Sequence, residues 1–150
     1  MQKPGITFRV EEKFDFSLEN KSRVVKWITT VLKKEGRTAR NISFLFCSDK
    51  YLLSINRQFL KHNFYTDIIT FDYSEKEKTE GEIFISIERV KENADSFKQP
   101  FQTELMRTII HGILHLCEYK DKKPAEKKRM RTKENEALAL LNKLAGIAKG

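Results

Sequence analysis

Two histidines inside an otherwise apolar run, His111-Gly112-Ile113-Leu114-His115-Leu116, place the strongest constraint on what this chain can fold into. The apolar residues around them predict a helix from Thr103 to about Leu116 that is apolar over most of its circumference and therefore largely buried. On that helix His111 and His115 lie one turn apart on the same face, about 5–6 Å apart at the base of their side chains. Each buried imidazole would need its own hydrogen-bond partner, and one shared cation meets both needs. The spacing therefore predicts a site for a zinc-sized metal ion.

Three residues beyond His115 compete to be the third ligand. Cys117 lies about 240° round the helix from His111 and so faces away. Glu118 returns to the histidine face if the helix continues through it. Asp121 reaches the ion only if the helix ends and the chain curls back, which three or more residues can span. The residues alone leave Asp121 and Glu118 as alternatives. An oxygen ligand beside two imidazoles favours one divalent ion, zinc first, with nickel, cobalt and manganese as alternatives.

The net charge of +8 is concentrated in residues 120–133. Eight basic side chains there face only two acidic ones, Asp121 and Glu126, so this segment carries +6. Such a segment favours a nucleic-acid partner, and a solvated helix face is the alternative. Because the segment begins beside the proposed metal ligands, we expect it to bind the phosphate backbone of a nucleic acid. This binding should weaken as the salt concentration rises. Seven of the eight basic residues, all except Lys133, are expected to bind the phosphates: Lys120, Lys122, Lys123, Lys127, Lys128, Arg129 and Arg131.

The rest of the chain predicts a single α+β domain over residues 1–150. Alternating or fully apolar runs predict strands near residues 6–10, 41–48, 67–73 and 81–86, with Phe14 and Phe16 continuing the first after a turn. Helical spacing predicts helices near 20–35, 49–59, 87–97 and 103–116, and a last one from Pro124 to about Gly146. Four strands mixed with about five helices predict a mixed four-stranded β-sheet flanked by helices.

Hydropathy and cysteine content indicate where the chain works. No apolar run approaches the roughly 20 residues of a membrane span. Residues 1–10 lack the pattern of a signal peptide, so we expect a cytoplasmic location. Cys47 and Cys117 then fit buried free thiols, with a disulfide between them as the alternative.

The histidine run resembles the signature of the YbeY family of bacterial endoribonucleases, also called rRNA maturation factors. His111, Gly112, Leu114, His115, Leu116 and Tyr119 match it in register. Asn56-Arg57, Thr66 to Phe71 and Gly81 to Ser86 resemble other stretches of the family, in family order. The resemblance spans about residues 40–140.

The resemblance implies a mixed four-stranded sheet with flanking helices and metal-dependent hydrolysis of single-stranded RNA. It ties that activity to maturation of small-subunit ribosomal RNA and to ribosome quality control, so ribosomal RNA and the small ribosomal subunit are the implied partners. It also implies that the third ligand occupies the position of Asp121, and that Arg57 points toward the site and grips phosphate.

Two residues depart from the family pattern. Asp121 replaces a third histidine, and its negative charge would raise the pKa of metal-bound water relative to an all-histidine site. Glu118 replaces the glycine at which the family's helix ends. A left-handed backbone conformation costs glutamate roughly 1 kcal/mol more than glycine. A different conformation at the C-terminus of the helix is therefore an alternative here. We favour Asp121 as ligand because it stands in the register of the family ligand, with Glu118 as the alternative.

The mechanism expected from these residues is metal-assisted RNA cleavage. The ion would polarise a phosphate oxygen or activate a water, while Arg57 offsets phosphoryl charge. Phe64, Tyr65 or Tyr119 would stack on bases, His62 is expected to be an exposed loop residue, and no general base is identifiable. One rival is a peptidase-like metal-dependent hydrolase. Gly112 argues against it, because a zinc protease has its general-base glutamate at this position. Another is a non-catalytic, ribosome-associated RNA-binding protein with a structural metal.

Overall fold

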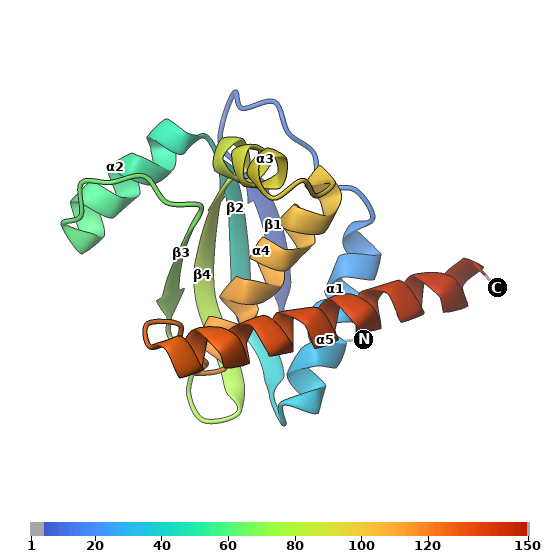
Figure 1. Cartoon of the computed structure of the whole chain (residues 1–150). Helices are drawn as coiled ribbons and strands as arrows, with labels where there is room; N and C mark the ends of the chain where they lie inside the picture. Colours follow the sequence, from blue (N-terminus) through green and yellow to red (C-terminus); the bar gives the residue numbers. More distant parts are fainter. Residues whose placement is uncertain (1–4, 150) are drawn as a thin grey trace.

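The computed structural model describes residues 5–149, so residues 1–4, which carry part of the signal-peptide expectation, lie outside it. One mixed four-stranded sheet forms its centre, with strand order β1-β2-β4-β3 (Figure 1). The strands are β1 (Ile6–Val10), β2 (Thr38–Cys47), β3 (Ile68–Asp72) and β4 (Lys78–Ser86). β1 and β4 both run parallel to β2, whereas β3 pairs antiparallel with β4. The predicted mixed sheet is confirmed.

Five helices flank this sheet, as predicted (Figure 1). They are α1 (Lys21–Lys34), α2 (Asp49–Leu60), α3 (Ile87–Ser96), α4 (Phe101–Leu116) and α5 (Pro124–Lys149). α4 packs on β3 and β4, and α5 crosses both α4 and α1. Within residues 5–149, no helix is long and apolar enough to cross a membrane.

Alternation along the strands divides the buried side chains between two cores. Phe44 and Phe46 of β2 and Ile83 of β4 belong to the main core, which α1, α4 and α5 cover. Cys47 points the other way, into a smaller core beneath α2. Cys47 and Cys117 are buried free thiols whose pKa burial raises to about 12, which confirms the prediction of unpaired cysteines.

Two boundaries differ from the sequence prediction. Phe14 and Phe16 do not continue a strand, because Lys13 takes a positive φ of 67° and the chain turns away after Val10. Both rings still pack against the main core, so their apolar spacing reflects burial without a strand. α5 runs to Lys149 and does not end near Gly146, since a helix tolerates one glycine at a cost of about 1 kcal/mol.

Gly112 sets how closely α4 approaches the sheet. A Cβ atom at Gly112 would lie 2.9 Å from Ile68 Cδ1 and 3.0 Å from Ile83 Cγ2, closer than side chains normally tolerate. The missing side chain lets the helix rest directly on β3 and β4. The neighbouring positions His111 and His115 remain partly exposed.

Candidate metal centre

The end of α4 determines which carboxylates can reach the histidines. The helix ends at Leu116, and Glu118 adopts the left-handed conformation with φ 73°. The amide of Tyr119 then donates to Leu114 O at 3.0 Å, which closes the last turn. The different helix end that the sequence left open for glutamate does not occur. A penalty of roughly 1 kcal/mol is small beside the packing of a buried helix.

This helix end separates the two alternative ligands. The side chain of Glu118 is 81% exposed and lies 3.6 Å from Arg37, away from the histidines. The chain curls back over the next three residues and brings Asp121 Oδ2 to 3.2 Å from Nε2 of both His111 and His115. The structure therefore brings Asp121 to the histidine pair and leaves Glu118 outside.

The three side chains converge on one point. His111 Nε2 and His115 Nε2 are 2.9 Å apart, and one ligand atom from each of the three residues lies within 4.8 Å of the others. Ligands 2.0–2.1 Å from a tetrahedral zinc ion are about 3.3 Å apart, close to these separations. Two imidazoles and one carboxylate are also a zinc-type donor set that leaves a fourth position open. The residues present fit a single divalent ion.

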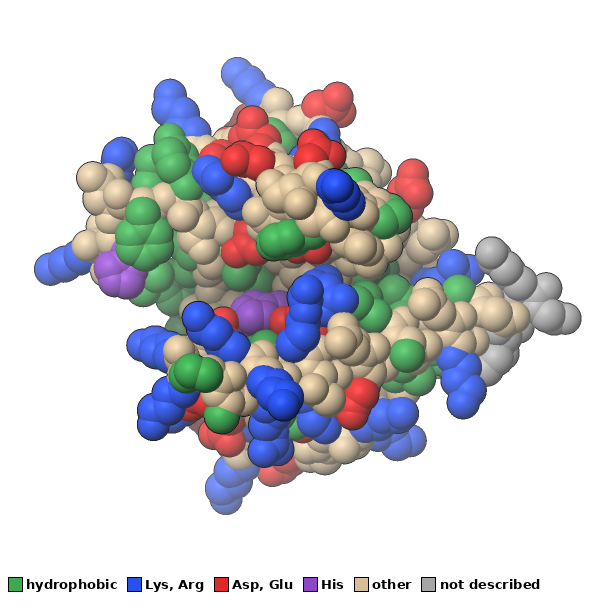
Figure 2. All heavy atoms as spheres, in the orientation of Figure 1, with side chains coloured by type: hydrophobic (Ala, Val, Ile, Leu, Met, Phe, Trp, Pro, Cys, Tyr) green, Lys and Arg blue, Asp and Glu red, His purple; other side chains and the backbone are tan. Residues whose placement is uncertain are grey.

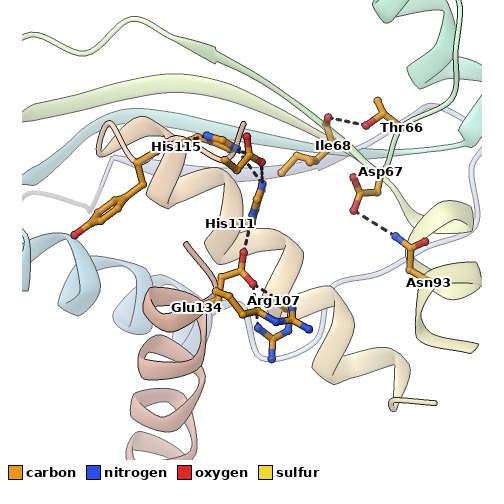
Figure 3. A network of polar contacts seen from close by, with 11 residues as sticks. Thr66, Asp67, Ile68, Asn93, Arg107, His111, His115 and Glu134 are labelled. Atoms are coloured by element: carbon orange, nitrogen blue, oxygen red, sulfur yellow. Dashed lines mark hydrogen bonds and ion pairs between the residues drawn. The ribbon is translucent and has the colours of Figure 1, made fainter. Parts of the chain in front are cut away.

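Each histidine is oriented through its other ring nitrogen (Figure 3). His115 Nδ1 lies 2.9 Å from the carbonyl oxygen of Tyr119, which can only accept, so His115 donates from Nδ1. His111 Nδ1 lies 2.6 Å from Glu134 Oε2. Both arrangements leave Nε2, the atom that faces Asp121, free to act as ligand.

Glu134 is a site residue that the sequence reasoning missed. Its side chain is 6% exposed, and its second oxygen accepts from Arg107 Nη1 at 3.0 Å. Burial raises the pKa of Glu134, but the hydrogen bonds from His111 and Arg107 outweigh it, so that pKa is lowered. Burial likewise lowers the pKa of His111, but the hydrogen bond to Glu134 and its charge more than offset this and raise it. For His115, burial and the neighbouring His111 lower the pKa.

A cavity of about 300 Å³ opens beside the cluster. Asp67, Glu104, Arg107, His111, Asp121 and Glu134 contribute to its lining. Asp67 accepts a hydrogen bond from Asn93 Nδ2 at 3.3 Å, and burial raises the pKa of its carboxyl group. In the sequence, Asp67 stood out only as part of a family-like stretch, and no role was predicted for it.

The seven predicted RNA-binding residues are all exposed, on the α4–α5 loop and the first turns of α5. Figure 2 shows histidine side chains on the floor of a hollow, with Lys and Arg side chains along its lower rim. The ring of Tyr119 lies under the Arg129 guanidinium, 5.4 Å from the centroid, and its hydroxyl donates to Glu35. Tyr119 is therefore held within the protein and is a poor surface for stacking on a base.

The helix α2 and the loop that follows it lie apart from the first turns of α5, which carry part of this rim (Figure 1). Arg57, in the last turn of α2, is exposed and donates from Nε to Asn63 Oδ1. Phe64 and Tyr65 are 56% and 54% exposed, and the ring of His62 stacks on Phe64 with 5.1 Å between centroids. His62 is an exposed loop residue, as predicted.

Together these features define a class: a small α+β protein with a candidate metal centre in an open cleft that has a basic rim. The family model described as Endoribonuclease YbeY matches residues 7–142. A protein of Flavobacterium psychrophilum named Endoribonuclease YbeY is 47% identical over 137 residues, covering 91% of this chain and 96% of the relative. One from Parabacteroides distasonis with the same name is 50% identical over 121 residues, covering 81% and 85%.

A solved structure agrees with the sequence relatives. The solution structure of a Thermotoga maritima protein superposes with a TM-score of 0.65 at 26% identity, over 96% of this chain and 91% of that one. The chain belongs to the endoribonuclease YbeY family. The predicted family and fold class are both confirmed.

Proposed function

We propose that this protein is a metal-dependent endoribonuclease that cleaves single-stranded RNA during maturation of small-subunit ribosomal RNA and in ribosome quality control. The observation that carries the proposal is the convergence of His111, His115 and Asp121 at one point beside the basic rim. Membership of the endoribonuclease YbeY family supports it. Its substrate suggests the small ribosomal subunit as partner and the cytoplasm as location.

The proposed ligands are His111, His115 and Asp121, with zinc as the ion that best suits them. A bound ion would supply Lewis acidity toward a phosphate oxygen or a water molecule. His111 and His115 offer neutral nitrogens, and Asp121 adds one negative charge. That charge weakens the pull of the ion on water relative to three histidines, so activity should be greatest at a higher pH than in an all-histidine site.

The protein's own charged residues are proposed to hold the RNA. The seven exposed basic side chains, from Lys120 to Arg131, would bind successive phosphates along one rim of the cleft. Arg57 is proposed to neutralise phosphoryl charge at the site. Its hydrogen bond to Asn63 restrains the guanidinium yet leaves it exposed, as a phosphate ligand requires.

Single-strand preference is proposed to come from the loop after α2. Phe64 and Tyr65 present exposed aromatic rings, and His62 already stacks on Phe64. Bases of single-stranded RNA stack on such rings with about 1–3 kcal/mol per base, whereas paired bases are not available to them. Phe64→Ala should therefore weaken binding of single-stranded RNA and leave binding of a duplex unchanged. Equal losses on both substrates would contradict this role.

The decisive experiment compares His115→Ala with His62→Ala as the matched control, because His62 is the exposed histidine outside the cluster. Protein purified without an affinity tag is assayed for metal content and for cleavage of labelled single-stranded RNA. His115→Ala should lose metal and cleavage, whereas His62→Ala should keep its metal and, with RNA at saturating concentration, its rate of bond cleavage. A folded His115→Ala protein that cleaves RNA at the wild-type rate would show that metal-assisted catalysis is wrong.

The same variants test the two rival functions. A non-catalytic RNA-binding protein with a structural metal would cleave no RNA in any form, and His115→Ala would lose stability. A peptidase-like hydrolase would cleave a peptide library in a metal-dependent way. A side chain at Gly112 would crowd Ile68 and Ile83, which opposes the glutamate that such a protease needs there.

A further inference from the structure

The carboxylate of Glu134 is fixed on both of its oxygens. Oε2 lies 2.6 Å from His111 Nδ1, and Oε1 accepts from Arg107 Nη1 at 3.0 Å. Arg131 Nη1 is 3.5 Å from the same Oε1. Only 6% of the side chain is exposed, so water competes little for these contacts. Glu134 is thus held from α4 and from its own helix α5, and cannot turn away from His111 without breaking buried hydrogen bonds.

A fixed carboxylate decides where the proton of a neutral imidazole resides. A carboxylate only accepts hydrogen bonds, so His111 next to it carries its proton on Nδ1. The lone pair then lies on Nε2, which is 2.9 Å from His115 Nε2 and 3.2 Å from Asp121 Oδ2. The opposite tautomer would aim a lone pair at the carboxylate and a proton at the metal position.

We propose that Glu134 is a positioning residue that holds His111 in the metal-binding tautomer and ring orientation. The inference rests on the proposed metal site and deepens it. His115 has a backbone carbonyl for the same purpose, which every sequence supplies, whereas the partner of His111 depends on one side chain from another helix. Metal affinity is therefore sensitive to substitution of a residue that does not touch the ion.

A purely structural role is the competing explanation, because Glu134 also joins α5 to Arg107 of α4. Glu134→Gln separates the two roles, because it keeps the side-chain length and one oxygen, which the arginine donors draw toward themselves, and so turns its NH2 group, a donor, toward His111 Nδ1. Glu104→Gln is the matched control. Glu104 is also 6% exposed and lines the same cavity, but it makes no hydrogen bond to His111 within residues 5–149.

The first measurement is the affinity of metal-free protein for Zn²⁺, by competition with a chromophoric chelator at neutral pH. Partners that orient metal-binding histidines typically contribute 10–100-fold in metal affinity. We expect Glu134→Gln to bind Zn²⁺ about 10–100-fold more weakly than wild type and Glu104→Gln to bind as wild type. The second measurement is the tautomer of each histidine in ¹⁵N-labelled metal-free protein by NMR. Neutral His111 should lose its preference for Nδ1–H in Glu134→Gln, while His115 keeps its own.

Wild-type Zn²⁺ affinity together with an unchanged His111 tautomer in folded Glu134→Gln would overturn the proposal. Glu134→Asp is the second variant, and it should weaken binding because the shorter side chain withdraws the carboxylate from Nδ1. Failure of the proposed metal site looks different, since wild type itself would then bind no Zn²⁺, whereas failure of the proposed activity would leave Zn²⁺ binding intact and RNA uncleaved by the wild type. The tautomer measurement would still decide whether Glu134 fixes the ring.

Discussion

The two sides of the His111 ring carry the same chemical group in two different settings. On the Nε2 side, Asp121 is 37% exposed and lies 3.2 Å from two histidine nitrogens. On the Nδ1 side, Glu134 is 6% exposed and is held by Arg107 and Arg131. Among residues 5–149, no arginine or lysine pairs with Asp121. A carboxylate without a fixed cation can accept a metal ion, whereas one already neutralised by arginine serves to orient.

The largest predicted effect comes from removing Asp121, the carboxylate on the cleft side of the His111 ring. Asp121→Ala should lose bound metal and reduce kcat/KM for single-stranded RNA by about 100-fold or more, equal to roughly 2.7 kcal/mol. Metal analysis and cleavage of labelled RNA measure this. Glu118→Ala is the control, because Glu118 is exposed and outside the cluster. Full metal occupancy in Asp121→Ala would show that another group is the third ligand.

Asp121→His tests the charge of the same ligand, because the variant keeps a metal-binding side chain and removes its negative charge. The variant should keep its metal, and the acid limb of its pH–rate profile for RNA cleavage should shift to lower pH. The reason is that a neutral ligand leaves more of the ion's charge to act on water. An acid limb that moves to higher pH would contradict the role given to the Asp121 charge.

On the buried side, the two arginines that contact Glu134 should differ in how much they contribute to the free energy of unfolding. Arg107 is 18% exposed and 3.0 Å from Glu134, whereas Arg131 is 60% exposed and 3.5 Å away. Arg107→Gln should lower the free energy of unfolding by about 2 kcal/mol, because it leaves a buried carboxylate partly unpaired. Arg131→Gln should cost less than about 1 kcal/mol, as exposed pairs do. Urea unfolding followed by circular dichroism compares them, and equal losses would refute this ranking.

A smaller effect concerns the basic rim that is proposed to hold the RNA. Lys127→Ala together with Lys128→Ala should reduce the slope of log K against log salt by about 1.4 for single-stranded RNA, or about 0.7 for each phosphate that a lysine no longer neutralises. Filter binding over a series of salt concentrations measures the slope. The control is the pair Lys33→Ala and Lys34→Ala at the end of α1, which should leave the slope unchanged.

The smallest predicted effect concerns Asp67, another carboxylate that lines the cavity. Its pKa is raised in the folded protein by burial, so its contribution is favourable below its unfolded pKa and is lost as pH rises through the folded pKa. Asp67→Asn should therefore raise the urea midpoint of metal-free protein at pH 7, and this gain should shrink toward pH 4. Urea melts at several pH values, with chelator present, test it. A lower midpoint at pH 7 would contradict the burial cost.

Local patterns predicted much of the fold and part of the site. The strand alternation, the i and i+4 histidines and the register of Asp121 are all properties of short segments. Glu134 could not be found that way, because it lies 23 residues from His111 and their contact depends on how α5 crosses α4. The sequence held one weaker signal, because Glu134 recurs at helical spacing with the apolar residues Met130 and Ala137 and so shares their predicted inward face. The role of Arg57 stays a prediction.

Gly112 also has a consequence for how this helix can evolve. A zinc protease needs a glutamate at that position, but here any side chain would meet Ile68 and Ile83 of the sheet. A glutamate there would first require the side chains of Ile68 and Ile83 to move aside or α4 to lift off β3 and β4. The step from this centre to a peptidase therefore needs compensating changes in the packing of helix and sheet as well as the new glutamate. The close contact between helix and sheet thus favours glycine at this position for packing reasons that are separate from the chemistry of the site.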